Sequence, residues 1–176
     1  MATTVKGSAE RGSRTDENSS PQRDAFSAIE LLEEDHREVE GFFEEYQELE
    51  NEAEKEALAL KICLTLQIHA QIEEELFYPE AQKAIAKPEL VDEAIVEHAA
   101  AKQLIAEIEA MEVGDSLRDA KVKVLGEQIS HHVEEEEGEL FPEVEGSKLD
   151  LKTLGHRMAD RKAELLQQLA SDGEIP

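Results

Sequence analysis

The feature that most constrains the fold is a pattern that occurs twice, once in each half of the chain. His69 and His132 each have apolar residues seven and three positions before them, a glutamate four positions after and a proline ten positions after. An earlier histidine preceded by an acid, His36 or His98, lies 33 or 34 residues before the later one. Self-similarity at this spacing predicts that one helical hairpin carrying two histidines is present twice.

The spacing around the later histidines predicts where their side chains point. Positions −7, −3, 0 and +4 fall on one face of an α-helix, so each later histidine shares its face with its glutamate and with apolar residues. The apolar residues of these two faces are Ile62, Leu66 and Phe77, and Val122, Leu125, Ile129 and Leu140. His36 and His98 lie on apolar stripes of the same kind. We therefore expect His36, His69, Glu73, His98, His132 and Glu136 to face the core.

The apolar periodicity predicts four long helices, over residues 25–50, 53–87, 88–111 and 116–142, and a shorter fifth helix over 149–170. Asp24 would cap the first helix, Pro79 would kink or break the second, and a turn at Gly114 would end the third. Long helices joined by short turns favour an all-α, up-down-up-down four-helix bundle. The fifth helix would cap one end of that bundle.

Composition divides the chain and limits its partners. Residues 1–24 hold almost no large apolar side chains and balance four acids against four bases, so we expect a disordered polar tail, a bundle domain over 25–146 and a C-terminal helix and tail over 147–176. The formal net charge of −25 then lies on the folded part, where it disfavours nucleic acid and membrane partners and favours cations.

Cysteine usage and hydropathy predict where the protein works. The single cysteine, Cys63, cannot form an internal disulfide and is expected to pack as a small apolar residue. The sequence shows no apolar run of about 20 residues and no signal peptide at its start, so we expect a cytoplasmic protein.

Buried histidines and glutamates at one level of a bundle need a physical explanation. In each hairpin the two histidines lie about 15 residues from the connecting turn, or about 22 Å at 1.5 Å per residue, so they are level. A buried carboxylate without a partner costs several kcal/mol. A hydrogen-bonded His–Glu core would reduce this cost, but two metal ions would reduce it further, because they neutralise both carboxylates and bind the imidazoles.

These residues resemble the hemerythrin-like HHE cation-binding domain over roughly residues 26–145. The resemblance is carried by His36, His69-x3-Glu73, His98 and His132-x3-Glu136, with the Leu-Phe-Tyr-Pro and Leu-Phe-Pro segments that follow. It implies a non-haem site with two iron ions joined by an oxo or hydroxo bridge. In that site Glu73 and Glu136 bridge the ions, His36 and His69 bind one, and His98 and His132 bind the other. Manganese or zinc in place of iron stays an alternative.

One position departs from the oxygen-carrying members of that family. They have a fifth histidine one turn after the third-helix histidine, where this chain has Lys102. Its counterpart in the first half is Glu40. Glu40 could be an additional ligand, Glu40 and Lys102 could contact the ligands or each other, or both could be solvated.

Other polar residues near the motifs are expected to be less important. We place His131 at the surface or beside the ligands, and His156 beyond the bundle. Tyr46 and Tyr78 could approach the site. Four neighbouring glutamates are expected on a solvated face: Glu134, Glu135, Glu137 and Glu139.

Three functions remain open. Two histidines per iron would leave positions for an exogenous ligand, so the first is a di-iron protein that interacts with O2, peroxide or a related small oxidant, with enzymatic turnover undecided. The second is an iron sensor, buffer or storage protein without turnover. The third is a structural zinc or manganese bundle.

Overall fold

The computed structural model describes Met1 and residues 26–172 of the chain, and within them every regular element is helical. The tail predicted over residues 1–24 lies, apart from Met1, outside the described residues. The long helices are α1 (Ala28–Glu48), α2 (Glu52–Ile72), α4 (Glu89–Glu109), α5 (Arg118–Glu135) and α7 (Leu151–Asp172). The helices α3 (Tyr78–Ala84) and α6 (Phe141–Glu145) are short, and the π-helical turns η1 (Glu73–Phe77) and η2 (Glu136–Leu140) precede them.

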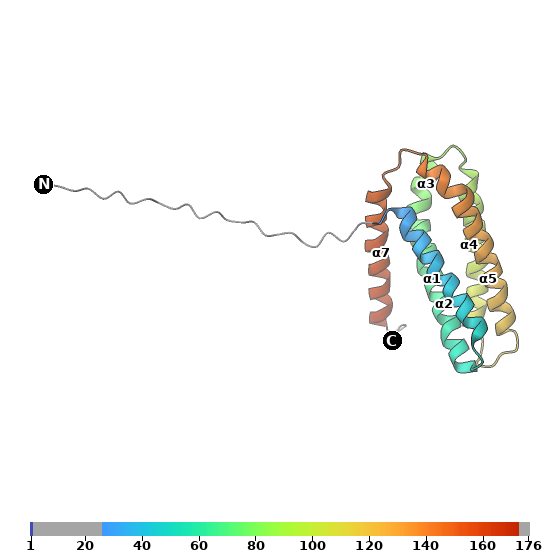
Figure 1. Ribbon diagram of the computed structural model, residues 1–176. Helices are drawn as coiled ribbons and strands as arrows, with labels where there is room; N and C mark the ends of the chain where they lie inside the picture. The colour runs from blue at the N-terminus through green and yellow to red at the C-terminus, as the bar shows by residue number, and fades with distance from the viewer. Residues whose placement is uncertain (2–25, 173–176) are drawn as a thin grey trace.

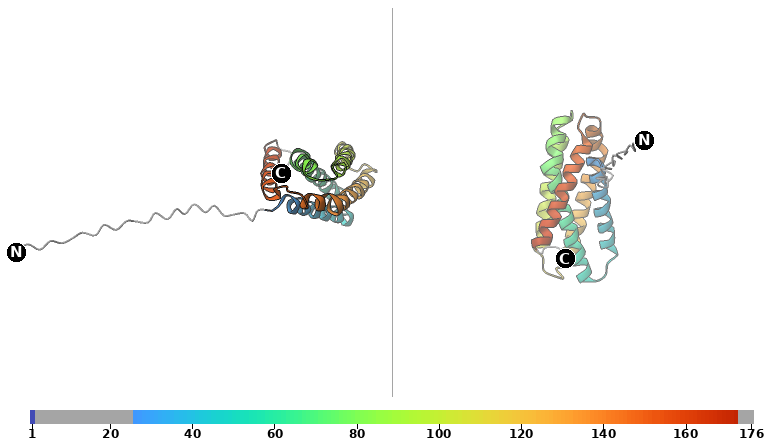
Figure 2. Two further views of the ribbon diagram at one scale, coloured as in Figure 1. Left: turned by 90° about the horizontal axis from the view of Figure 1, so that it is seen from above. Right: turned by 90° about the vertical axis from the view of Figure 1, so that its left-hand side faces the viewer.

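The helices form the predicted bundle. α2 runs through η1 into α3, and α5 runs through η2 into α6, so two long composite helices alternate in direction with α1 and α4 (Figure 1). The view from above shows these four arranged around a common interior (Figure 2). The all-α, up-down-up-down prediction is confirmed. Among the described helices, none has an apolar stretch long enough to cross a membrane.

Local sequence explains where the first helices begin. Ser27 caps α1 and forms a reciprocal capping box with Glu30, so the helix begins at Ala28, while the predicted cap Asp24 lies outside the described residues. Asn51 caps α2 by accepting hydrogen bonds from two backbone N–H groups. Gly114, in the predicted turn before α5, has a φ of 79°, which glycine adopts without strain.

The helix that contains Pro79 continues through it instead of breaking. A proline lacks an N–H, and its ring clashes with the carbonyl four residues earlier, so a regular α-turn cannot surround it. The chain widens one turn upstream: the N–H of Tyr78 donates to the carbonyl of Glu73, and the N–H of Phe141 donates to that of Glu136. Both widened turns begin at a predicted metal-binding glutamate. They bring the residue five positions later, Tyr78 or Phe141, into the core at 2% exposure.

The interior of the bundle has two apolar halves. One cluster gathers around Leu32, Ile72, Phe77 and Phe141, and the other gathers around Val39, Leu66, Ile105 and Leu125. Leu32 and Val39 flank His36 on α1, so that histidine lies at the boundary between the clusters. The same holds for the other three predicted histidines, and the six predicted ligands form a polar layer across the core.

The fifth helix differs from expectation in place and length. α7 has 22 residues, whereas α1 and α4 have 21 each, so it is not shorter than the bundle helices. It packs lengthwise against α1 and α2 instead of capping an end of the bundle (Figures 1 and 2). Leu154, Met158 and Leu165 of α7 are buried in the first apolar cluster. The domain boundaries at 25–146 and 147–176 stay predictions.

Candidate metal centre

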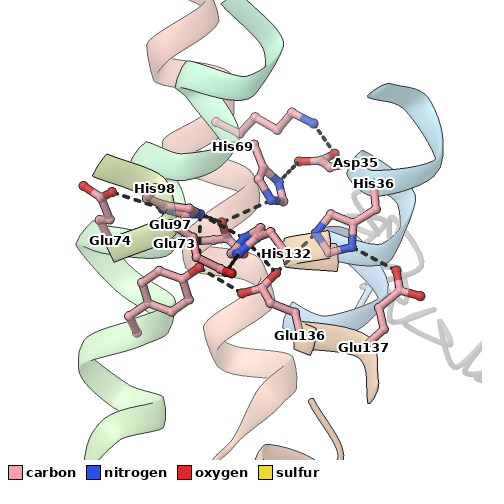
Figure 3. A network of polar contacts seen from close by, with 12 residues as sticks. Asp35, His36, His69, Glu73, Glu74, Glu97, His98, His132, Glu136 and Glu137 are labelled. Atoms are coloured by element: carbon pink, nitrogen blue, oxygen red, sulfur yellow. Dashed lines mark hydrogen bonds and ion pairs between the residues drawn. The ribbon is translucent and has the colours of Figure 1, made fainter. Parts of the chain in front are cut away.

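The structure brings the six predicted ligands together in the middle of the bundle (Figure 3). Each is at most 6% exposed: His36, His69, Glu73, His98, His132 and Glu136. Oε2 of Glu73 lies 3.1 Å from Nε2 of His69 and 3.3 Å from Nε2 of His98. Oε2 of Glu136 lies 3.4 Å from Nε2 of His36 and 3.5 Å from Nε2 of His132. Each carboxylate therefore faces one histidine of its own helix and one of the other hairpin.

The histidines form two pairs. The rings of His36 and His69 lie 4.9 Å apart between centroids, and those of His98 and His132 lie 4.7 Å apart. Two groups of side chains have ligand atoms within 4.8 Å of one another: His36, His69, Glu73 and Glu136, and Glu73, His98 and His132. These groups match the pairing of the histidines that the resemblance implies; Glu73 belongs to both groups and Glu136 to the first alone. The assignment of individual ligands stays a prediction.

Each histidine is held from behind by a second carboxylate. The Nδ1 atoms of His36, His98 and His132 hydrogen bond to Glu137 at 2.9 Å, Glu74 at 3.1 Å and Glu97 at 2.7 Å. Nδ1 of His69 forms a longer ion pair with Asp35, at 3.5 Å. A carboxylate on Nδ1 directs the Nε2 lone pair toward the centre and makes it a stronger donor to a metal.

The four carboxylates that contact Nδ1 follow a rule that the sequence analysis missed. The acid directly before the first histidine of a hairpin, Asp35 or Glu97, contacts the second histidine of the same hairpin. The residue directly after a core glutamate, Glu74 or Glu137, contacts the first histidine of the other hairpin. Glu137, which was expected on a solvated face, is only partly exposed and contacts His36. The acid–His and Glu–Glu pairs recur in both halves of the repeat, and this recurrence was the available signal.

Three of these carboxylates also contact a basic side chain. Lys102 donates to both oxygens of Glu74 at 2.6 Å, Arg37 pairs with Glu137, and Lys162 pairs with Asp35. Lys102 therefore lies one carboxylate away from His98.

Glu40 is not brought into the cluster. Its side chain is 61% exposed and accepts from Arg37 at 3.1 Å, which links it to His36 only through Arg37 and Glu137. Of the three options for Glu40 and Lys102, this geometry favours contacts behind the ligands.

A tyrosine distinguishes the two halves. The hydroxyl of Tyr78 donates to Oε1 of Glu136 at 2.9 Å and lies 3.1 Å from Nε2 of His98. Phe141 occupies the equivalent place in the other half and stacks on His36, with 5.9 Å between ring centroids. Tyr46, in contrast, bonds to Asp119, away from the ligand cluster.

The charges inside the layer depend on one another. Burial raises the pKa of the Glu73 carboxyl, but the charge of His69 and the close contacts with His69 and His98 hold it well below its ordinary value. Burial lowers the pKa of His69, but the charge of Glu73 and the contacts with Asp35 raise it to about 10. Burial, reinforced by the charges of Glu73 and Glu136, raises the pKa of Tyr78 well above its ordinary value. Without a metal, the core therefore contains ion pairs.

These ion pairs leave several polar atoms without a hydrogen bond. Among the described residues, both oxygens of Glu73, Oε2 of Glu136 and the Nε2 atoms of His36 and His69 are buried and have no hydrogen-bond partner. Buried polar atoms are nearly always bonded, and a metal is one established way to satisfy them. Imidazole nitrogens and carboxylate oxygens converging on one point are a donor set that iron, manganese and zinc accept. The residues present therefore fit a metal centre.

A small cavity adjoins the histidines on the side away from the π turns. Its volume is about 20 Å³, room for one molecule of about the size of water. All four histidines line it, together with apolar side chains that include Val39, Leu66, Ala101, Ile105 and Ile129.

The remaining candidates lie away from the cluster. His131 is 63% exposed and lies with Glu97 and Glu135 in a third, partly exposed group of potential ligands. His156 is exposed on α7. Cys63 is 1% exposed in the second apolar cluster, which confirms its packing role, and burial raises the pKa of its thiol to about 12.

Comparisons with known proteins agree with this geometry. The family model for the hemerythrin HHE cation-binding domain matches residues 27–144, which contain all six predicted ligands. The chain is similar to a solved structure of a hemerythrin HHE cation-binding domain-containing protein from Mycobacterium kansasii. The two are 25% identical with a TM-score of 0.71, and the match covers 84% of this chain and 94% of that protein. No curated protein gives a significant match.

Proposed function

Because the chain belongs to the hemerythrin HHE cation-binding domain family, we propose that it is a non-haem di-iron protein that interacts with O2, peroxide or a related small oxidant. His36 and His69 would hold one iron, His98 and His132 the other, and Glu73 and Glu136 would bridge them. The observation that carries the proposal is the orientation of the histidines. Their Nε2 atoms face two glutamates whose buried oxygens are largely unbonded. Three of their Nδ1 atoms hydrogen bond to outer carboxylates, and that of His69 lies 3.5 Å from Asp35.

The surroundings of the site support a small exogenous ligand. Iron bound there would supply one-electron chemistry and open coordination positions. The adjoining cavity of about 20 Å³ has mostly apolar walls and holds only a small molecule. The hydroxyl of Tyr78 adds a hydrogen-bonding group on the opposite side of the histidines.

Elemental analysis of protein purified from iron-replete cells tests the metal assignment. We expect two irons per chain in the natural protein and fewer than two in Glu136→Gln, which keeps the shape of the side chain but removes its charge. Glu134→Gln is a matched control, because Glu134 is exposed two residues away on the same helix, and it should retain two irons. Two zinc or manganese ions in place of iron would support the structural-bundle alternative and contradict the proposal.

Optical spectroscopy tests the reaction with oxidants. The air-exposed iron form should show charge-transfer absorption. The absorption of the reduced protein should change when O2 or peroxide is added. An iron-loaded protein without such bands, and without a response to either oxidant, would exclude this function and leave iron sensing, buffering or storage.

A further inference from the structure

The fifth helix contributes a charge to the interior of the bundle. Asp35, which contacts Nδ1 of His69, also forms an ion pair with Lys162 of α7. Two other outer carboxylates have basic partners from the bundle itself, Arg37 on α1 and Lys102 on α4. Lys162 is therefore a basic residue from outside the four-helix bundle that reaches the layer behind the histidines.

Asp35 depends on its basic partner more than the other outer carboxylates do. Its side chain is 6% exposed, whereas those of Glu137, Glu74 and Glu97 are 24%, 33% and 23% exposed. Water can solvate those three, but it cannot reach most of Asp35. Its contact with His69, at 3.5 Å, is also longer than the contacts of 2.7–3.1 Å on the other three histidines. The position of the Asp35 carboxylate therefore rests largely on Lys162.

The docking of α7 leaves little freedom for Lys162. Next to it, Arg161 holds both oxygens of Glu75, in the π turn that begins with Glu73, at 2.7 and 3.1 Å. Nearer the start of α7, Gly155 packs so closely against the segment before α1 that a Cβ there would lie 2.5 Å from the carbonyl oxygen of Phe26. α7 thus contacts both segments that supply the His69 environment, α1 and η1.

We propose that α7 is part of the metal centre and that Lys162 is a positioning residue for one of the two metal ions. Lys162 fixes Asp35, and Asp35 holds His69 with Nε2 toward Glu73. In the second half, Glu97 performs the role of Asp35. Among residues 26–172 it has no lysine or arginine within 4 Å, and its basic neighbours there are His132 at 2.7 Å and His131 at 3.8 Å. The two ions would therefore differ in their dependence on α7. This inference rests on the proposed metal binding by the six core residues.

The test is a Co²⁺ titration of the metal-free full chain, with chelator competition to obtain the affinity of each of two ions. Lys162→Met removes the charge but keeps an apolar stem of similar length. This variant should bind one ion with an affinity lower by about tenfold or more, the usual effect of losing such an outer contact. Its affinity for the other ion should stay within about threefold of the natural value. Lys162→Arg should restore the natural affinities. Arg157→Met, at an exposed position on the same helix, is the control and should bind both ions as the natural chain does.

The outcomes separate this inference from the proposed function. Natural affinity for both ions in Lys162→Met would overturn it, and so would an equal loss for both ions, which would indicate general loosening of the fold. Asp35→Asn repeats the test with the lysine in place, and it should lower the affinity for the same single ion. The double variant, Asp35→Asn with Lys162→Met, should lose no more affinity than Asp35→Asn alone. A natural chain that binds no Co²⁺ would instead refute the metal site itself.

Discussion

His69 lies between two buried carboxylates, Glu73 and Asp35, and they determine its protonation. Because its pKa is raised to about 10, the imidazole carries a proton at pH 7 in the metal-free protein. A metal needs the neutral ring, so binding must expel that proton. We expect release of about one proton or more per chain and apparent metal affinity that rises with pH up to about pH 10, where the free imidazole loses its proton. Calorimetry of Co²⁺ binding in two buffers of different ionisation enthalpy measures the release; equal heats in both would contradict it.

A single hydroxyl separates Tyr78 from its counterpart Phe141, and substitution isolates its contribution. Tyr78→Phe should lower the free energy of unfolding of the metal-free protein by about 1–3 kcal/mol, because Oε1 of Glu136 loses its hydrogen bond inside the core. Tyr46→Phe removes the same group from Asp119, whose side chain is 61% exposed, and should cost about 1 kcal/mol or less. Urea denaturation of both variants gives the comparison. Equal costs would mean that the Tyr78 hydroxyl has no special role at the site.

At the scale of helices, the sequence predicts which segments are helical better than how they are joined. Apolar periodicity places the helices to within a few residues, and the repeat identifies all six inward-facing side chains. Pro79 marks a discontinuity but not its form, because a kink, a break and a π turn all accommodate a proline. The partners of the histidines' Nδ1 atoms and the docking of α7 were not predicted, because they depend on which helices become neighbours.

Gly155 shows how such a tertiary contact constrains one element. Gly155→Ala should lower the free energy of unfolding by about 1–3 kcal/mol, because its Cβ would overlap the backbone at Phe26 and push α7 away from α1. Gly41→Ala is a matched control inside α1, where an added Cβ meets nothing within 4 Å. It should stabilise the protein by about 0.5–1 kcal/mol through helix propensity. Urea denaturation measures the free energy of unfolding of both variants. If both changes shift it in the same direction, α7 does not dock as described.

At the scale of the whole molecule, the polar layer makes folding and metal binding interdependent. The layer lies across the full core between two apolar clusters, so its repulsions and unbonded atoms act on every helix of the bundle at once. Local opening at this level would separate the two halves of the core. The metal-free chain should therefore be a folded but weakened bundle.

Metal removal measures that interdependence. A ligand that binds only the folded state at a thousand times its Kd adds about 4 kcal/mol of stability, which corresponds to a rise of roughly 10 °C in Tm for a chain of this size. We expect the natural protein to melt higher by about that amount with iron than after chelation, and Glu136→Gln to show a smaller difference. Circular dichroism melts with and without chelator measure both. If the natural midpoint is unchanged by chelation although two ions are bound, the apo core already satisfies its carboxylates through ion pairs with His69 and His98. Metal occupancy would then not be sensed through folding.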